Sequence, residues 1–270
     1  MLIKSISMTI QNVKIEFQTR LRNFYDIKEI QSMFELLAQD LGFSKTDIVL
    51  NPTKELNDVQ TQFFNKTLEL LTKHQPVQYI REKADFYGFE FCVSNSVLIP
   101  RQETELLVDT IIKNNKIENP TILDLGTGSG CIAISLAYYL KKSQVFALDI
   151  STKALDIARK NAQNQNVDVT FIEDNMLNIS SMHTIPQIDI LVSNPPYVRN
   201  SEKSEMKKNV LEFEPHSALF VEDSNPLIFY AAIAKIAKEK LIKNGVVYCE
   251  INEALGNETL QLFKDYGFAD

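Results

Sequence analysis

The 270-residue sequence has no tryptophan, only three cysteines and only three histidines. The cysteines are odd in number and far apart, which fits neither a disulfide framework nor a zinc site. We expect all three to be small buried hydrophobic residues: Cys92, Cys131 and Cys249. Metal-ligand spacing is also missing from the histidines, so no metal site is predicted from His74, His183 and His216.

Long apolar runs and a basic charge excess are missing too. No run approaches the ~18 apolar residues needed to cross a membrane, and residues 1–8 lack the long apolar core of a signal peptide. A soluble, cytoplasmic protein without a membrane partner is therefore expected. The net charge is −7, with 11 basic against 10 acidic residues in 1–83 and 17 against 25 in the remainder. Since duplex DNA is normally bound through basic stripes, a protein partner is favoured over nucleic acid.

The first part of the chain predicts a helical domain over residues 1–83. Apolar residues recur at helical spacing from 10 to about 73, with breaks near 42–44 and 51–52. Such a bundle could dock a substrate or form a structural cap, and the lack of catalytic-looking residues favours docking. Residues 84–100 follow as a hairpin-like connector, with one strand in the alternating run 85–93 and a second in the short run 97–99.

Strands and helices alternate after residue 101, which predicts a third segment, 101–270. Strands are expected at 121–125, 144–149, 167–172, 188–193 and 246–251, and helices at 131–140, 153–163, 227–242 and 253–266. This alternation implies an α/β fold, a parallel sheet with helices on both faces. Ligands of such sheets bind beyond the carboxyl ends of the strands.

Three of the eight glycines stand at alternate positions just after the first of these strands. The loop runs Asp124, Leu125, Gly126, Thr127, Gly128, Ser129 and Gly130. Glycine lets the backbone turn sharply and approach a ligand closely. A dehydrogenase fingerprint would need Gly-x-Gly-x-x-Gly, but the third glycine comes one residue early and Cys131 takes its place. The loop therefore departs from the dehydrogenase pattern.

Polar residues also follow the next two strands. Asp149 could accept both ribose hydroxyls of a cofactor, or it could be the N-cap of the helix that starts near Ser151. Asp174 and Asn175 end the third strand, where polar groups could meet an adenine; alone they would be an ordinary turn.

The tetrapeptide Asn194-Pro195-Pro196-Tyr197 follows the fourth strand and can hold a planar amide. Asn194 offers an acceptor oxygen, Pro195 and Pro196 stiffen the backbone and lack N–H groups, and the Tyr197 ring can stack on the bound group. The alternative is a Pro-Pro turn that only ends the strand.

Glycine loop, ribose acid and tetrapeptide in this order resemble class I S-adenosylmethionine-dependent methyltransferases that act on planar nitrogens. Further segments are similar to the N5-glutamine methyltransferases that modify peptide chain release factors. These are the Asn of the tetrapeptide and the stretches 75–80, 98–105 and 213–215. The resemblance covers most of the chain from about residue 75 and is most specific over 98–197.

This resemblance implies a Rossmann-like methyltransferase domain, S-adenosyl-L-methionine as cofactor and class 1 release factors as protein partners, with no direct nucleic-acid contact. The glutamine of their Gly-Gly-Gln motif would be methylated on its side-chain nitrogen. Asn194, Pro195 and Tyr197 would be catalytic, and Pro196 would join them in binding substrate. Cofactor contacts would come from Gly126, Thr127, Gly128, Ser129, Gly130, Asp149, Asp174, Asn175 and Asn194. Arg101 and Thr104 would close over the cofactor or be surface residues of a helix start.

Three other functions stay open at this point. A ribosomal protein could be the glutamine substrate, an adenine nitrogen of nucleic acid could be methylated instead, or the chain could be a helical adaptor with a vestigial methyltransferase domain. The resemblance also implies a strand hairpin after the helix at 253–266. The sequence stops at 267–270, so that hairpin is expected to be missing, either because the chain is truncated or because strand 246–251 ends the sheet as an exposed edge.

Overall fold

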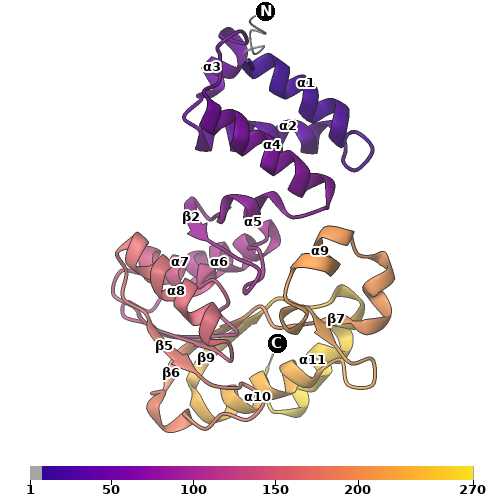
Figure 1. The fold of residues 1–270 in the computed structure, drawn as a ribbon. Helices are drawn as coiled ribbons and strands as arrows, with labels where there is room; N and C mark the ends of the chain where they lie inside the picture. The colour runs from indigo at the N-terminus through magenta and orange to yellow at the C-terminus, as the bar shows by residue number, and fades with distance from the viewer. Residues whose placement is uncertain (1–7, 270) are drawn as a thin grey trace, which may run out of the picture. The chain divides into compact units, whose positions relative to one another are not determined.

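The computed structural model describes residues 8–269. The chain divides into two compact units. One comprises the residues up to Glu82 together with Lys208–Phe213, and the other comprises Lys83–Lys207 and the residues from Glu214 onward. The segment expected to be a separate connector therefore belongs to the second unit. Each unit is described by itself below (Figure 1).

The first unit is helical, as predicted. Its helices are α1 (Ile10–Leu21), α2 (Ile27–Asp40), α3 (Lys45–Leu50), α4 (Asp58–Thr72), α5 (Val77–Arg81) and the short α9 (Lys208–Phe213). Side chains of Thr9, Asp26, Ser44 and Asn57 cap the first four, and each cap satisfies backbone N–H groups that the first turn leaves without partners. Phe17, Phe34 and Phe64 lie in mutual ring contact at the centre, with ring centroids 5.7 to 5.8 Å apart.

A five-stranded parallel sheet forms the frame of the second unit. Its order is β5-β4-β3-β6-β9. The strands are β3 (Thr121–Leu125), β4 (Gln144–Asp149), β5 (Thr170–Glu173), β6 (Ile188–Ser193) and β9 (Leu241–Cys249), and the helices are α6 (Gln102–Asn114), α7 (Cys131–Tyr139), α8 (Thr152–Gln165), α10 (Ile228–Lys240) and α11 (Gly256–Asp265). The predicted α/β fold, a parallel sheet with helices on both faces, is confirmed.

Alternate residues of the strands reach opposite faces of this sheet. On β3, Ile122 belongs to the core that includes Ile111 of α6 and Ile134 of α7, whereas Leu123 belongs to the core that includes Tyr230 and Ile233 of α10. All of these side chains are buried. Figure 1 shows α7 and α8 on one side of the sheet and α10 and α11 on the other. Because both faces are covered, the strands read as nearly continuous apolar runs.

The predicted hairpin exists but is shorter than expected. Its strands are β1 (Lys83–Phe86) and β2 (Phe89–Cys92). The second half of β1 and all of β2 lie inside the run 85–93, which was expected to form a single strand. Tyr87 and Gly88 both have positive φ, +47° and +83°, and a two-residue turn of this kind matches the twist of paired strands. The stretch 97–99, expected to be the second strand, is not a strand, although Val97 and Ile99 are buried.

Several boundaries at the C-terminal side also differ from the prediction. Helix α10 ends at Lys240 rather than 242, because Leu241 already pairs with Ile188 in the sheet. Within residues 8–269 no strand follows α11, and β9 pairs only with β6, so β9 lies at the sheet edge. Short elements complete the unit: β7 (Val198–Arg199), β8 (Phe220–Val221) and the 3-10 helices Met182–Thr184, Asn200–Glu205, His216–Ala218 and Glu253–Leu255.

Among the described residues, no helix combines the length and the apolar character that crossing a bilayer requires.

Candidate active site

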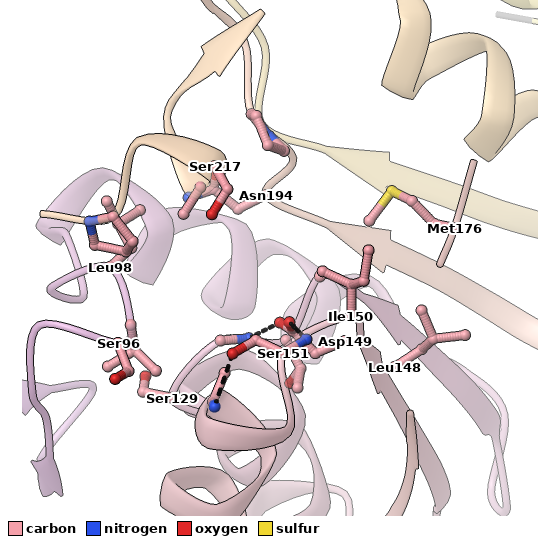
Figure 2. A pocket seen from close by; sticks show the side chains of 18 of the residues that line it. Ser96, Leu98, Ser129, Leu148, Asp149, Ile150, Ser151, Met176, Asn194 and Ser217 are labelled. Carbon is pink, nitrogen blue, oxygen red and sulfur yellow. Dashed lines mark hydrogen bonds between the residues drawn. The ribbon is translucent and has the colours of Figure 1, made fainter. Parts of the chain in front are cut away.

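A cavity of about 430 Å³ lies at the carboxyl ends of the strands in the second unit. Its wall includes the segments that follow β3, β4, β5 and β6, where the sequence placed its candidate residues. Figure 2 shows Asp149, Asn194 and Met176 among the side chains around it. Four strand ends that are far apart in the sequence therefore meet at one site, as expected for parallel strands.

The three glycines of the loop differ in their surroundings. All have positive φ, +73° at Gly126, +56° at Gly128 and +81° at Gly130. A Cβ on Gly128 would meet no atom within 4 Å, so this glycine borders open space. A Cβ on Gly130 would lie 2.8 Å from Ile134 and 3.1 Å from the Ala158 Cβ. Gly126 and Gly128 line the cavity, whereas Gly130 does not and instead permits close packing of α7 and α8.

The buried carboxyl of Asp124, at the start of the loop, accepts a hydrogen bond from Thr127. The Thr127 hydroxyl donates to Asp124 Oδ2 at 2.6 Å. Asp124 Oδ1 has no hydrogen-bond partner among the described residues, and Asp124 is completely buried. Burial raises the pKa of Asp124 to about 7, although the Thr127 hydrogen bond opposes the rise. Thr127 and Ser129 line the cavity, but the Thr127 hydroxyl is directed to Asp124.

Asp149 lines the cavity at the end of β4, and it does not cap the following helix. The cap of α8 is Ser151, whose Oγ accepts from the Ala154 N–H at 3.2 Å. Asp149 Oδ2 accepts from the Gly128 N–H at 2.8 Å, and Oδ1 accepts from the Ser151 N–H at 2.9 Å. Burial raises the pKa of Asp149, while these N–H groups oppose the rise. Each carboxylate oxygen retains a lone pair for a further donor such as a ribose hydroxyl.

Asp174 and Asn175 line the cavity after β5, and their side chains differ in how many hydrogen bonds they already accept. Asp174 Oδ1 accepts from the Asn175 N–H, and Oδ2 accepts from the N–H groups of Ser180 and Ser181 at 2.8 and 2.6 Å. Partial burial pulls the pKa of Asp174 upward, but the hydrogen bonds from these three residues outweigh it and lower the pKa to about 2. Asp174 therefore organises its own loop. Asn175 Oδ1 accepts from the Leu177 N–H at 2.9 Å.

The tetrapeptide starts directly after β6, and its residues have different environments. Asn194 and Pro196 line the cavity, whereas Pro195 and Tyr197 do not. Asn194 Nδ2 donates to Thr104 Oγ1 at 3.0 Å. Within residues 8–269, neither Asn194 Oδ1 nor the Pro195 carbonyl oxygen accepts a hydrogen bond. The Tyr197 hydroxyl donates to Glu250 Oε1 at 2.7 Å, and burial together with this bond raises its pKa.

Two further acidic residues hydrogen-bond to residues of this site: Glu214, from the stretch 213–215 that contributed to the resemblance, and Glu250, which had no signal in the sequence. Glu250 lies just beyond β9 and accepts from both Tyr197 and Thr104. Glu214 is 4% exposed and accepts from the Ile99 N–H at 3.2 Å and from Arg101 at 2.5 Å. Arg101 and Thr104 both line the cavity, but Thr104 is 2% exposed and is therefore not a surface residue of the helix start.

The composition of the cavity wall suits a ligand that carries a nucleoside. The open space beside Gly128 would admit a ligand close to backbone N–H groups, and Asp149 supplies a carboxylate at the adjacent strand end. Ile150, Met176 and Leu177 add apolar surface to the same wall. An aromatic base needs such apolar contact, and a ribose needs acceptors for its hydroxyl groups.

Comparisons with known proteins agree with this geometry. A model described as PrmC N-terminal domain matches residues 16–81, and one described as Methyltransferase small domain matches residues 101–217. The release factor glutamine methyltransferase of Flavobacterium psychrophilum is 47% identical over 266 residues, which cover 97% of this chain and 93% of that protein. The chain belongs to the release factor glutamine methyltransferase family.

Other members of the family are also similar over most of this chain. The protein of that name from Bacteroides thetaiotaomicron is 41% identical over 93% of this chain and 90% of its own length. The one from Streptococcus pneumoniae is 39% identical over 88% of this chain and 84% of its own. The family and the enzyme class predicted from the motifs, a methyltransferase, are therefore confirmed, and the adaptor alternative is not favoured.

Proposed function

We propose that this protein transfers a methyl group from S-adenosyl-L-methionine to the side-chain nitrogen of the glutamine in the Gly-Gly-Gln motif of class 1 release factors. Family membership supports the glutamine substrate. The observation that carries the chemistry is the pair of acceptors at the tetrapeptide, Asn194 Oδ1 and the Pro195 carbonyl, which no described residue engages. Release factors take part in translation, so the cytoplasm is the proposed compartment of an enzyme that acts on them.

The two acceptors address the difficulty of the reaction. An amide nitrogen is a weak nucleophile because its lone pair is delocalised into the carbonyl group. When bound, the cofactor supplies an electrophilic methyl group on a sulfonium centre. Asn194 Oδ1 and the Pro195 carbonyl would each accept one N–H of the substrate amide, which orients the nitrogen toward that methyl group.

The same acceptors favour the transition state. Positive charge would develop on the substrate nitrogen as it takes the methyl group from the cofactor sulfur, and the two fixed carbonyl dipoles of Asn194 and Pro195 would stabilise that charge. The nitrogen then loses a proton to solvent, so no strong general base is required before attack.

The cofactor would be held by the part of the cavity wall that follows β3, β4 and β5. Asp149 would accept the ribose hydroxyls, the loop at Gly126 and Gly128 would follow the cofactor backbone, and Asn175 would contact the base. The Asp174 carboxylate would act through the loop that it organises. The first unit would dock the release factor, since none of its described residues lines the cavity.

The deciding experiment is a methylation assay with peptide mass spectrometry. The full-length protein is incubated with S-adenosylmethionine and a class 1 release factor. A single methyl group on the Gly-Gly-Gln glutamine is expected, and a release factor with that glutamine changed to alanine is the substrate control. Asn194→Ala should reduce kcat/KM by about 10²- to 10³-fold. Transfer to a ribosomal protein or to DNA under conditions that leave the release factor unmethylated would refute the proposal.

A further inference from the structure

We propose that Thr104 and Glu250 are positioning residues that determine which end of the Asn194 amide faces the cavity. The inference rests on the proposed function, because it concerns the acceptor oxygen that would bind the substrate amide. It assigns a role to two residues from α6 and the end of β9, far in the sequence from the tetrapeptide.

The geometry is a branched chain of hydrogen bonds ending on one carboxylate. Asn194 Nδ2 donates to Thr104 Oγ1 at 3.0 Å, and Thr104 Oγ1 donates to Glu250 Oε2 at 2.7 Å. The second carboxylate oxygen, Oε1, accepts from the Tyr197 hydroxyl at 2.7 Å. Glu250 therefore connects to the first and the last residue of the tetrapeptide.

The donor and acceptor properties of these groups fix the direction of each hydrogen bond in the network. A glutamate carboxylate only accepts hydrogen bonds, and a threonine hydroxyl has a single proton to donate. Since that proton goes to Glu250, Thr104 Oγ1 can only accept from its other neighbour. Asn194 must then present its NH₂ group to Thr104, which leaves Oδ1 for the cavity. Without this polarity the two ends of the amide would be nearly equivalent in shape, and a rotated amide would offer a donor where the substrate needs an acceptor.

Hydrogen bonds of the Glu250 backbone hold this hydrogen-bond chain in place. The Glu250 N–H donates to the Ser193 carbonyl at 3.1 Å, and the Glu250 carbonyl accepts from the Tyr230 hydroxyl at 3.2 Å. Thr104 is 2% exposed, so water has little access to its hydroxyl. A hydrogen bond in such surroundings is costly to leave unmade. The Glu250 backbone is thus fixed at the end of the sheet, and its carboxylate, through Thr104, fixes the orientation of the Asn194 side chain.

The same polarity explains why asparagine suits the first position better than aspartate. In Asn194→Asp, an oxygen would replace Nδ2 opposite Thr104 Oγ1. Three acceptors, namely the new carboxylate, Thr104 Oγ1 and the Glu250 carboxylate, would then share one hydroxyl proton. A glutamine at position 250 would relieve the conflict, because its amide could donate to Thr104 and release the hydroxyl proton toward the new carboxylate.

The first test compares three threonine variants in the release factor methylation assay. Thr104→Val keeps the shape and removes the hydroxyl, so kcat should fall by about 10- to 100-fold, with the KM for release factor changed by less than about 3-fold. Thr104→Ser keeps the hydroxyl and should retain most of the activity. Thr110→Val is the matched control on the same helix, because the Thr110 hydroxyl bonds only the Leu106 carbonyl at the surface. Binding of S-adenosylhomocysteine, measured by calorimetry, shows whether each variant still folds around the cofactor.

The second test is a double-mutant cycle of Asn194→Asp and Glu250→Gln, with Glu253→Gln on the exposed residue nearby as control. Glu250→Gln should raise the kcat of Asn194→Asp by roughly 5-fold or more, a coupling of the size found for residues in one hydrogen-bond network. The melting temperature of the double variant should likewise exceed that of Asn194→Asp alone. A structural role for Glu250 predicts instead that the losses add.

Wild-type kcat in Thr104→Val, or a double variant no more active and no more stable than Asn194→Asp, would overturn the inference. Failure of the proposed function looks different, since the wild-type protein itself would then leave the release factor unmethylated. In that case the melting temperatures of the cycle still report whether Glu250 sets the polarity at position 194.

Discussion

At the scale of single residues, glycines that look alike in the sequence have different tasks. Gly128 and Gly130 both adopt positive φ, where a Cβ costs roughly 1–2 kcal/mol. Beyond that common cost, a Cβ at Gly128 would enter open space at the cavity, whereas one at Gly130 would press on Ile134 and Ala158. Position within the loop therefore decides whether glycine serves binding or packing.

We accordingly expect Gly128→Ala and Gly130→Ala to fail in different ways. Gly128→Ala should melt within a few degrees of the wild type but bind S-adenosylhomocysteine at least about 10-fold more weakly, because the methyl group occupies ligand space. Gly130→Ala should lower the melting temperature by several degrees more than Gly128→Ala, because an overpacked contact typically costs about 1–3 kcal/mol. Calorimetric melting and isothermal titration measure both. Equal loss of stability in the two variants would contradict this division of roles.

Because its carboxyl is buried, Asp124 should make the stability of the folded protein depend on pH. Burial raises its pKa to about 7 in the folded protein, against ~3.9 for an unfolded aspartate. The folded state then binds more protons between these values, so Asp124 contributes stability that is complete below about pH 4 and is lost as the pH rises to about 7. Asp124→Asn removes this titration.

The difference in melting temperature between Asp124→Asn and the wild type should therefore move in favour of the variant as the pH rises from about 5 to about 8. The ligand-free protein is used, and Asp149, whose negative charge adds to the rise in the pKa of Asp124, is unchanged in both proteins. A difference that stays constant with pH would show that Asp124 does not titrate in this range.

At the scale of elements, one buried side chain connects the hairpin, helix α8 and the glycine loop. Asn161 of α8 is fully buried. Its Oδ1 accepts from the Cys92 N–H at 2.7 Å, and its Nδ2 donates to the carbonyls of Cys92 and Ser129 at 3.0 and 2.9 Å. Asn161 thus provides hydrogen-bond partners for backbone groups of both the end of β2 and the glycine loop. These bonds explain why the hairpin belongs to the second unit.

Asn161→Ala should lower the free energy of unfolding of the second unit by about 2–4 kcal/mol, since each buried backbone group left without a partner costs ~1–3 kcal/mol. Asn164→Ala, an exposed position on the same helix with only a 3.6 Å contact to Cys92 Sγ, is the control and should cost less than about 1 kcal/mol. Urea denaturation measures both. Similar losses in the two variants would mean that the Asn161 bonds are not needed.

At the scale of the whole molecule, all the described residues that line the cavity belong to the second unit. A ligand that binds only the folded cavity stabilises the part that contains it, by ~2.7 kcal/mol at a concentration of about 100 Kd. S-adenosylhomocysteine should therefore protect backbone amides of the second unit from hydrogen exchange, most strongly at the segments after β3, β4 and β5. Helices α1 to α4 should exchange at unchanged rates. Protection centred on α1 to α4 would place the ligand elsewhere.

The parts of this structure that follow from local pattern were predictable. β3, β4 and β6 begin and end at the predicted residues, because buried strands give short apolar runs bounded by turn residues. The hairpin was misplaced because its turn depends on positive φ at Tyr87, a residue that rarely adopts it. Helix α10 ends earlier than its periodicity suggests because sheet pairing at Leu241 competes with helix formation.

The same distinction holds for the site. The amino-acid sequence by itself determined the order of the glycine loop, Asp149 and the tetrapeptide along the chain, and with it the family and the cavity edge, because parallel strands bring their carboxyl ends together. Only the tertiary structure decided that Ser151 rather than Asp149 caps α8, that Asp174 is engaged by its own loop, and that Thr104 and Glu250 meet at Asn194. Those outcomes depend on hydrogen-bond partners far apart in the sequence or on competition between neighbouring groups for one donor, which residue spacing does not encode.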